Sequence, residues 1–131
     1  SANTISIVSA KTGKIINTLV TGDAPRRITS TEDQKIMLVT CIGSGELMLF
    51  DANQQELLRE TRMHGDRSEQ SSRPLDVVSG PDSQFAYVTC ARGEFVAIVD
   101  LINGQFIDRI DARKGPDGIA YARPSAVTTI R

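Results

Sequence analysis

The stretch KIMLVTCIGSGELMLFD, from Lys35 to Asp51, returns 49 positions later as QFAYVTCARGEFVAIVD, from Gln84 to Asp100. The two copies align without a gap. A second match, of Val8-Ser9-Ala10-Lys11 with Phe50-Asp51-Ala52-Asn53, has an offset of 42 positions. Internal repeats with a period of roughly 20 to 50 residues are typical of repeat architectures. The chain is therefore built from a repeated unit of about 42 residues, and one copy is longer by about seven residues around 64–73.

Each unit contains four short segments rich in β-branched and aromatic residues, and turn residues separate these segments. They predict strands over 4–8, 15–20, 26–30, 35–42, 46–51, 56–63, 74–79, 85–92, 94–100 and 105–112, a further first strand over 119–121, and the start of another in 125–131. Four short strands in about 40 to 45 residues match one blade of a β-propeller. A β-sandwich also uses short strands, but it does not require the same side chains to recur from unit to unit. We therefore expect an all-β fold of propeller blades, each of four antiparallel strands.

This expectation divides the chain into a partial blade over 1–24, two blades over 25–73 and 74–115, and a partial blade over 116–131. Together these segments amount to about three blades, whereas closed propellers have about four to eight. Two interpretations remain open. The chain is a segment of a longer propeller, or two copies form a homo-oligomer that closes a six-bladed ring. The first is favoured because Ser1 falls inside a blade.

Two tetrapeptides at the centre of the repeat carry a resemblance to a known family. Leu38-Val39-Thr40-Cys41 and Tyr87-Val88-Thr89-Cys90 resemble the Tyr-Val-Thr-Asn motif of the YVTN β-propeller repeat family, although cysteine replaces asparagine in both. The turn Ser79-Gly80-Pro81-Asp82 and the strand Val96-Ala97-Ile98-Val99-Asp100 also resemble that family's repeat. The resemblance implies a bacterial or archaeal propeller in a periplasmic or extracellular location. Because the family includes surface proteins, periplasmic binding proteins and enzyme domains, it implies no single function.

The composition disfavours several kinds of partner and cofactor. Fifteen Lys and Arg residues against 16 Asp and Glu residues provide no global field for nucleic acid or an anionic membrane. No apolar run approaches the roughly 20 residues of a membrane-spanning helix. Two cysteines and one histidine do not suffice for a four-ligand zinc site. Haem-attachment, phosphate-loop and dinucleotide-binding motifs are absent from the sequence, so we expect no metal and no cofactor.

Propeller geometry predicts one loop face on which binding residues gather. The connections between blades and the loops between second and third strands share this face, and arginines are frequent in them. Arginine offers forked donors to carboxylate or phosphate groups, which points to an anionic ligand. The lengthened loop over 64–73 is the best single candidate because binding usually resides in loops on a rigid scaffold. The candidate ligand-binding residues are Arg26, Arg27, His64, Arg67, Arg73, Asp76, Arg92, Arg113 and Asp117.

Each of these assignments has a simpler alternative. The arginines alternate with acidic residues such as Asp23 and Glu94, as on any solvated loop surface. Arginine and aspartate from neighbouring blades also pair with each other in such an arrangement. Cys41 and Cys90 are expected to be buried thiols that pack like small hydrophobic residues, rather than a redox or metal pair. Asp51 and Asp100 are expected to accept hydrogen bonds from the turns that follow them.

Two functional hypotheses follow, and we identify no catalytic residue. His64 is the single histidine and has no recognisable nucleophile motif beside it. The first hypothesis is a non-catalytic scaffold that binds a protein or a small anionic ligand on its loop face. The alternative is a segment of a propeller enzyme, such as a lactonase-like hydrolase or a cofactor-dependent oxidoreductase, with its catalytic residues in other blades.

Overall fold

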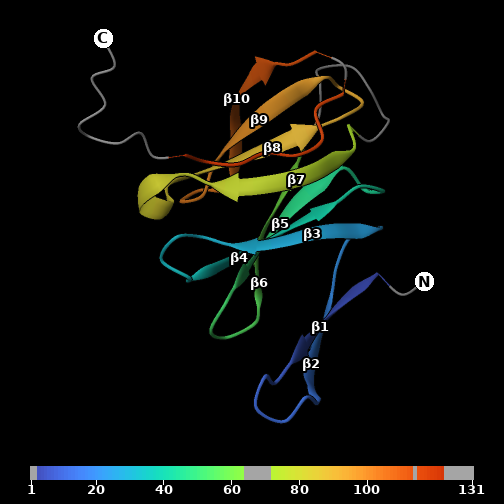
Figure 1. Ribbon diagram of the computed structural model, residues 1–131, viewed down its shortest axis with the longest axis vertical. Helices are drawn as coiled ribbons and strands as arrows, with labels where there is room; N and C mark the ends of the chain where they lie inside the picture. The colour runs from blue at the N-terminus through green and yellow to red at the C-terminus, as the bar shows by residue number, and fades with distance from the viewer. Residues whose placement is uncertain (1–2, 64–71, 114, 123–131) are drawn as a thin grey trace.

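The strands of this protein form three antiparallel sheets, which follow one another along the chain (Figure 1). The computed structural model describes residues 3–63, 72–113 and 115–122. The first sheet pairs β1 (Thr4–Val8) with β2 (Ile15–Val20). The second sheet has the order β3 (Pro25–Ser30), β4 (Ile36–Cys41), β5 (Glu46–Asp51), β6 (Leu57–Arg62). The third has the order β7 (Pro74–Ser79), β8 (Phe85–Cys90), β9 (Phe95–Asp100), β10 (Gln105–Asp111).

The predicted all-β fold of four-stranded antiparallel sheets is confirmed, and ten predicted strands lie within two residues of their observed bounds. A 3₁₀ turn, Pro81–Ser83, follows β7. The predicted strand over Ile119 to Tyr121 is wrong, because residues 115–122 have no regular secondary structure. A strand requires backbone partners along a ladder, and no described residue provides them for this segment. The strand predicted in 125–131 lies outside the described residues.

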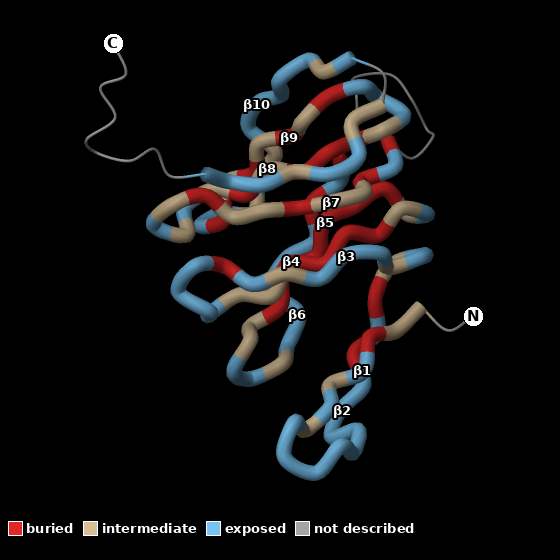
Figure 2. Tube along the Cα trace, in the orientation of Figure 1, coloured by how far each residue is buried: buried red, intermediate tan, exposed pale blue. Residues whose placement is uncertain are grey.

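The second sheet lies between the other two and is buried on both faces (Figure 2). One face packs against the third sheet through Leu38, Leu47 and Leu49. The opposite face packs against the β1–β2 hairpin through Val39, Met48 and Phe50. Strands that are covered on both faces are almost continuously apolar, which explains the uninterrupted hydrophobic run of the repeat. The outer strands β2, β6 and β10 are largely exposed.

A threonine in each full sheet links the first strand of its sheet to the backbone of a later segment. The Thr40 hydroxyl accepts a hydrogen bond from Arg27 N (3.1 Å) and donates one to Leu75 O (3.2 Å) on β7 of the next sheet. The Thr89 hydroxyl repeats this arrangement, since it accepts from Asp76 N (3.0 Å) and donates to Asp117 O (2.7 Å). The ladder is irregular between Pro25 and Arg27 and between Pro74 and Val77. The hydroxyls therefore provide backbone groups with partners where the ladder shifts.

Replacement of Thr89 by valine tests this bridge. Thr89→Val removes the hydroxyl but keeps the shape of the side chain, so Asp76 N and Asp117 O lose their partner. We expect the free energy of unfolding to fall by about 1–3 kcal/mol, the cost of leaving a buried polar group unpaired, as measured by urea denaturation. Thr89→Ser, which keeps the hydroxyl, is the matched control and should lose less. An unfolding midpoint of Thr89→Val equal to that of the parent would show that the bridge contributes nothing.

Candidate functional site

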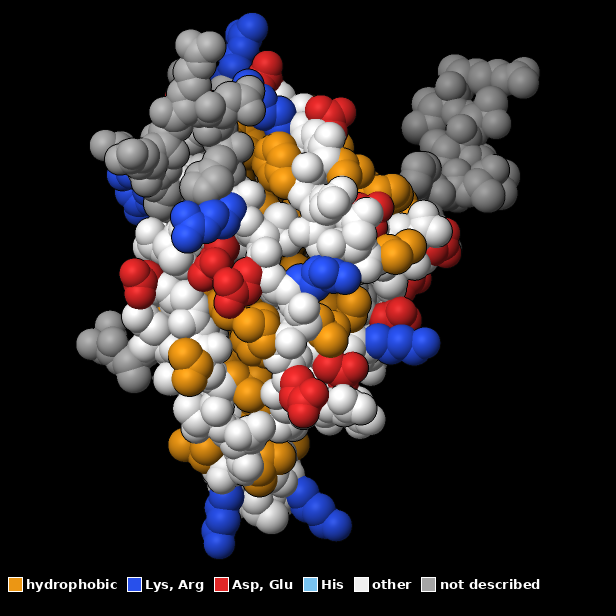
Figure 3. Space-filling model, turned by 180° about the vertical axis from the view of Figure 1, so that it is seen from behind, with side chains coloured by type: hydrophobic (Ala, Val, Ile, Leu, Met, Phe, Trp, Pro, Cys, Tyr) orange, Lys and Arg blue, Asp and Glu red, His pale blue; other side chains and the backbone are white. Residues whose placement is uncertain are grey.

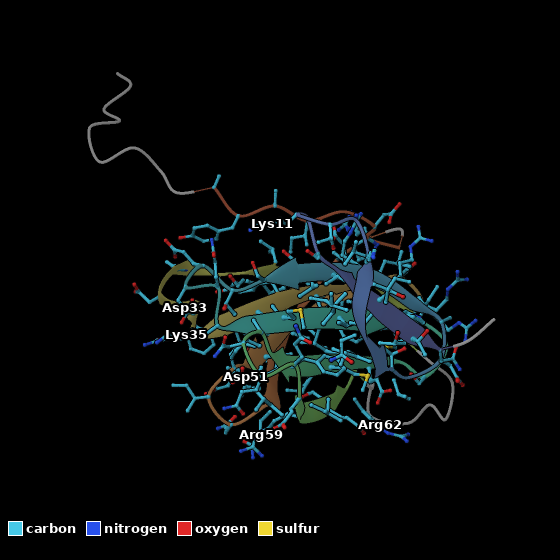
Figure 4. The ribbon with its side chains drawn as sticks, turned by 90° about the horizontal axis from the view of Figure 1, so that it is seen from below. Lys11, Asp33, Lys35, Asp51, Arg59 and Arg62 are labelled. Carbon is cyan, nitrogen blue, oxygen red and sulfur yellow. The ribbon has the colours of Figure 1, made fainter. Side chains whose placement is uncertain are left out.

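Loops that are distant in sequence gather at one end of the strands, on a surface that we call the connection face (residues 21–24, 42–45, 72–73, 91–94 and 112–118 among the described ones). Backbone hydrogen bonds join them in pairs. Gly43 N donates to Asp23 O (2.9 Å), and Ala91 N donates to Arg73 O (3.1 Å). The turns of the sheets lie at the opposite end, where Figure 4 shows Asp33 and Lys35, away from Arg62. The connection face is therefore built on backbone contacts that fix its loops.

Arg27 and Asp76 form an ion pair between the first strands of two neighbouring sheets. Arg27 Nε lies 3.0 Å from Asp76 Oδ1, and the Asp76 side chain is only 17% exposed. The same Oδ1 accepts a hydrogen bond from Val77 N (2.8 Å), and Oδ2 accepts one from Ile119 N (3.3 Å). One carboxylate thus holds β3, β7 and the segment after β10 together. For these two residues the simpler alternative holds, because the arginine and the aspartate pair with each other.

Arg26 has a different environment from its neighbour Arg27. It lines an open depression of about 350 Å³ together with Ala24, Pro25, Arg27 and Ile42. The Arg26 side chain is exposed and has no ion-pair partner among the described residues. Ala24 has a φ of 54°, in the left-handed region, immediately before Pro25. This fixed bend directs the start of β3 past the depression and holds the Arg26 backbone beside it.

The remaining candidates from the sequence lie around the same face or outside the described residues. Arg73, Arg92 and Arg113 are exposed, and Arg92 N donates to Ser72 O (3.0 Å), which brings its loop next to Arg73. Asp117 is exposed, and its backbone carbonyl, not its side chain, contacts Thr89. His64 and Arg67 lie outside the described residues. The structure therefore brings the described arginines to one face of the molecule.

The two cysteines are buried free thiols, as expected. Desolvation raises the pKa of Cys41 to about 11 and the pKa of Cys90 to about 12. Within residues 3–63, 72–113 and 115–122, no group of three or more His, Cys, Asp or Glu side chains is arranged to hold a metal ion. None of the helices in this part of the chain is long and apolar enough to span a membrane.

The two turn aspartates act as the sequence predicts. Asp51 Oδ1 accepts hydrogen bonds from Asn53 N (2.9 Å) and Gln54 N (2.7 Å). Asp100 Oδ1 accepts them from Ile102 N (2.8 Å) and Asn103 N (3.4 Å). Both carboxylates therefore stabilise the hairpin turn that follows their strand.

Truncation of each partner of the Arg27–Asp76 pair separates structural from electrostatic roles. Asp76→Ala leaves Val77 N and Ile119 N without their acceptor, so the free energy of unfolding should fall by about 1–3 kcal/mol. Arg27→Ala removes only an exposed partner, and the loss should be about 0–1 kcal/mol. Urea denaturation of both variants and of the double variant measures the two effects and their coupling. Equal losses in the two single variants would contradict the bridging role of Asp76.

The raised thiol pKa values predict slow alkylation of the native protein. At pH 8 both thiols stay protonated, because this pH lies well below about 11 and about 12, and only the thiolate reacts. Iodoacetamide should therefore leave Cys41 and Cys90 unmodified in the native protein at pH 8, as followed by mass spectrometry. The same reagent should modify both thiols once the protein is unfolded in roughly 6–8 M urea. Rapid modification of either thiol without denaturant would show that its burial is wrong.

Comparisons with known proteins agree with this arrangement of sheets. Hydrazine synthase of Kuenenia stuttgartiensis is similar in structure, with a TM-score of 0.75 and 19% sequence identity, over 87% of this chain and 31% of that chain. A functionally unknown protein of Desulfotomaculum acetoxidans has a TM-score of 0.68 and 17% identity, over 86% of this chain and 36% of that chain. The Cps50 (Swd1) β-propeller domain of Myceliophteria thermophila has a TM-score of 0.62 and 15% identity, over 76% of this chain and 29% of that chain.

No family model matches the sequence, and no curated protein matches it. The chain spans about a third of the length of each similar structure. At sequence identities of 15–19%, this structural similarity establishes a shared fold but not a shared function. The described strands of this protein therefore form blades of the β-propeller fold.

Proposed function

We propose that this protein is a non-catalytic β-propeller scaffold that binds an anionic group on its connection face, presented by a protein or by a small ligand. The observation that carries this proposal is the open depression beside Arg26. A guanidinium there offers several donors in a fixed fork, which suits a carboxylate or a phosphate.

The surroundings of Arg26 favour recognition over packing. Arg27 is engaged with Asp76, whereas Arg26 is exposed and has no ion pair among the described residues. Backbone hydrogen bonds fix the loops around the depression, since Ile42 N donates to Ala24 O (3.0 Å). A preorganised site loses less conformational entropy on binding than a mobile one. An anionic group placed in the depression would therefore lie beside the positive charge of Arg26, between loops that backbone hydrogen bonds hold in place.

Three finer assignments belong to the same proposal. The Val-Thr-Cys motifs at 39–41 and 88–90 support membership of the YVTN-type propeller family. By that resemblance the protein acts in the periplasm or outside the cell. Further blades, from a longer chain or from a second copy, complete the ring, because closed propellers contain about four to eight blades.

The alternative of a propeller enzyme is less well supported. One structural neighbour, hydrazine synthase, is an enzyme by name, but the likeness concerns the fold. No arrangement of the described residues favours a particular reaction.

A labelled acidic peptide tests the proposed site. Fluorescein-labelled pentaglutamate is titrated with the protein, and binding is followed by fluorescence anisotropy. Arg26→Ala should weaken binding by about tenfold or more, because a hydrogen bond to a charged group contributes about 1.5–3 kcal/mol. Lys35→Ala removes one positive charge at the opposite end of the strands and should leave the affinity nearly unchanged. Equal weakening by both variants, or no saturable binding by the parent, would overturn the proposal.

A further inference from the structure

A groove on the outer side of the molecule combines acidic side chains with apolar walls. It lies between β2 and the outer strands of the second sheet and has a volume of about 410 Å³. We call it the outer groove. Figure 3 shows the molecule from behind, where hydrophobic, acidic and basic side chains all reach the surface. The residues that line the groove include Leu19, Gly22, Glu46, Met48, Leu57 and Glu60.

Glu46 is a carboxylate in a place where the fold otherwise buries hydrophobic groups. The residue is only 7% exposed, and it lines the groove beside Met48. Its Oε1 accepts a hydrogen bond from the Ser44 hydroxyl (2.9 Å). Among the described residues, no hydrogen bond reaches Oε2. Ser72 Oγ is the one fully buried side-chain oxygen or nitrogen without a partner in the described part of the chain, so Glu46 Oε2 reaches solvent in the groove and has acceptor capacity left for a ligand.

The third sheet shows what the repeat places at the same positions. At the offset of 49, Glu46 corresponds to Phe95, and Glu60 corresponds to Arg109. The Phe95 ring is 1% exposed, and the Arg109 guanidinium lies over it at 5.5 Å from its centroid. Where the third sheet buries an aromatic ring under an arginine of its own, the second sheet presents two carboxylates to an open groove. Arg109, the cation that covers the ring in the third sheet, is replaced by the acidic Glu60 in the second.

The neighbouring residue changes together with Glu46. Ser44 corresponds to Gly93, where a Cβ would overlap the Phe95 ring. In the second sheet the ring is absent, and the serine hydroxyl orients the carboxylate instead. On the other side of the groove, a Cβ at Gly22 would overlap Glu46 Oε1 and Ser44 Oγ. Ser44, Glu46 and Glu60 therefore differ together from Gly93, Phe95 and Arg109, and the second sheet has a hydroxyl and two carboxylates where the third has an aromatic ring and an arginine.

Within residues 3–63, 72–113 and 115–122, no basic group forms an ion pair with these carboxylates. Arg62 stands opposite Glu46 in the register of β5 and β6. The described part of the chain contains two ion pairs, Arg27–Asp76 and Arg109–Asp111. Neither Glu46, Glu60 nor Arg62 belongs to them. The charge of the groove is therefore complementary to a cation from outside.

We propose that the outer groove binds a lysine or arginine side chain presented by a partner protein. The aliphatic part of such a side chain would lie along Leu19, Met48 and Leu57, and its charged end would reach Glu46 and Glu60. A hydrated metal ion would gain nothing from these apolar walls, and the described residues do not arrange the three or more ligands that it needs. This interaction is independent of the anion site on the connection face, because it uses the opposite charge on a different surface.

The three methionines of the chain provide a direct probe of this groove. Met37, Met48 and Met63 would give three methyl signals in a ¹³C-methyl-labelled sample, and Met48→Leu identifies the signal of Met48. Only Met48 lines the groove, whereas Met63 packs toward the third sheet. We expect acetyl-Leu-Arg-Leu-amide to shift the Met48 signal saturably and to leave the Met63 signal in place. The matched peptide with citrulline, which has the same shape without the charge, should bind about tenfold more weakly.

Variants of the protein separate the carboxylates from the fold. Glu46→Gln keeps the shape and the acceptor for Ser44, and it should weaken binding of the arginine peptide by about tenfold. Glu94→Gln, which lies in another loop, is the charge-matched control and should have no effect. A triple variant with Ser44→Gly, Glu46→Phe and Glu60→Arg gives the second sheet the residues that the third sheet has at the equivalent positions. It should fold, fill the groove and abolish the shift of the Met48 signal by the peptide.

The following results would overturn the proposal. The citrulline peptide binds as well as the arginine peptide, or Glu46→Gln binds as well as the parent. Acetyl-arginine-amide alone binds as tightly as the tripeptide, which would indicate a small cation in place of a protein partner. The Met48 signal moves on dilution without peptide, which would indicate that a second copy of this chain occupies the groove.

Discussion

The structure depends on the burial of one sheet between two others. Strands β4 and β5 carry apolar side chains on both faces, so the second sheet is stable only when both faces are covered. The third sheet covers one face and the β1–β2 hairpin covers the other. Each cover is itself a sheet with a second face, which is why units of this kind repeat. Both the repeat in the sequence and the stacking of the sheets follow from the need to cover the two apolar faces of a sheet.

Hydrophobic contact between sheets does not by itself determine how they are rotated relative to one another. The Thr40 hydroxyl and the Asp76 carboxylate provide that information, because they join the second sheet to the third at defined atoms. Thr89 and Asp76 fix the segment after β10 in the same way. Hydrogen bonds are directional and hydrophobic contacts are not. The same atoms therefore position the loops of the connection face, including the depression beside Arg26. The proposed binding surface rests on the polar links at the inner edge of the sheets.

The two proposed surfaces have opposite charge and lie on different elements. The connection face presents arginine, whereas the outer groove presents glutamate between apolar walls. A scaffold with two such surfaces suits the joining of partners of different chemistry, and neither surface requires a reacting group. The outer groove arises from coordinated differences at three positions of an otherwise regular repeat, and the second and third sheets keep the same strand order.

The sequence by itself determined the repeat, the fold class and nearly every strand, because glycine, proline and aspartate end each short apolar segment. Ile119 to Tyr121 is the exception, since a strand depends on a partner that local sequence does not contain. Only the tertiary structure decided which charges are available. It pairs Arg27 with Asp76 and places Glu46 in a groove. The sequence had left Arg27 open between ligand binding and pairing with an aspartate, and it had given no role to Glu46. In the sequence, the groove is indicated by the replacement of Phe95 by Glu46 at the equivalent position of the repeat. That replacement can be interpreted only once the position of β2, which forms the other wall of the groove, is known. Pairing and exposure are relations between distant residues, and these are fixed when the sheets pack.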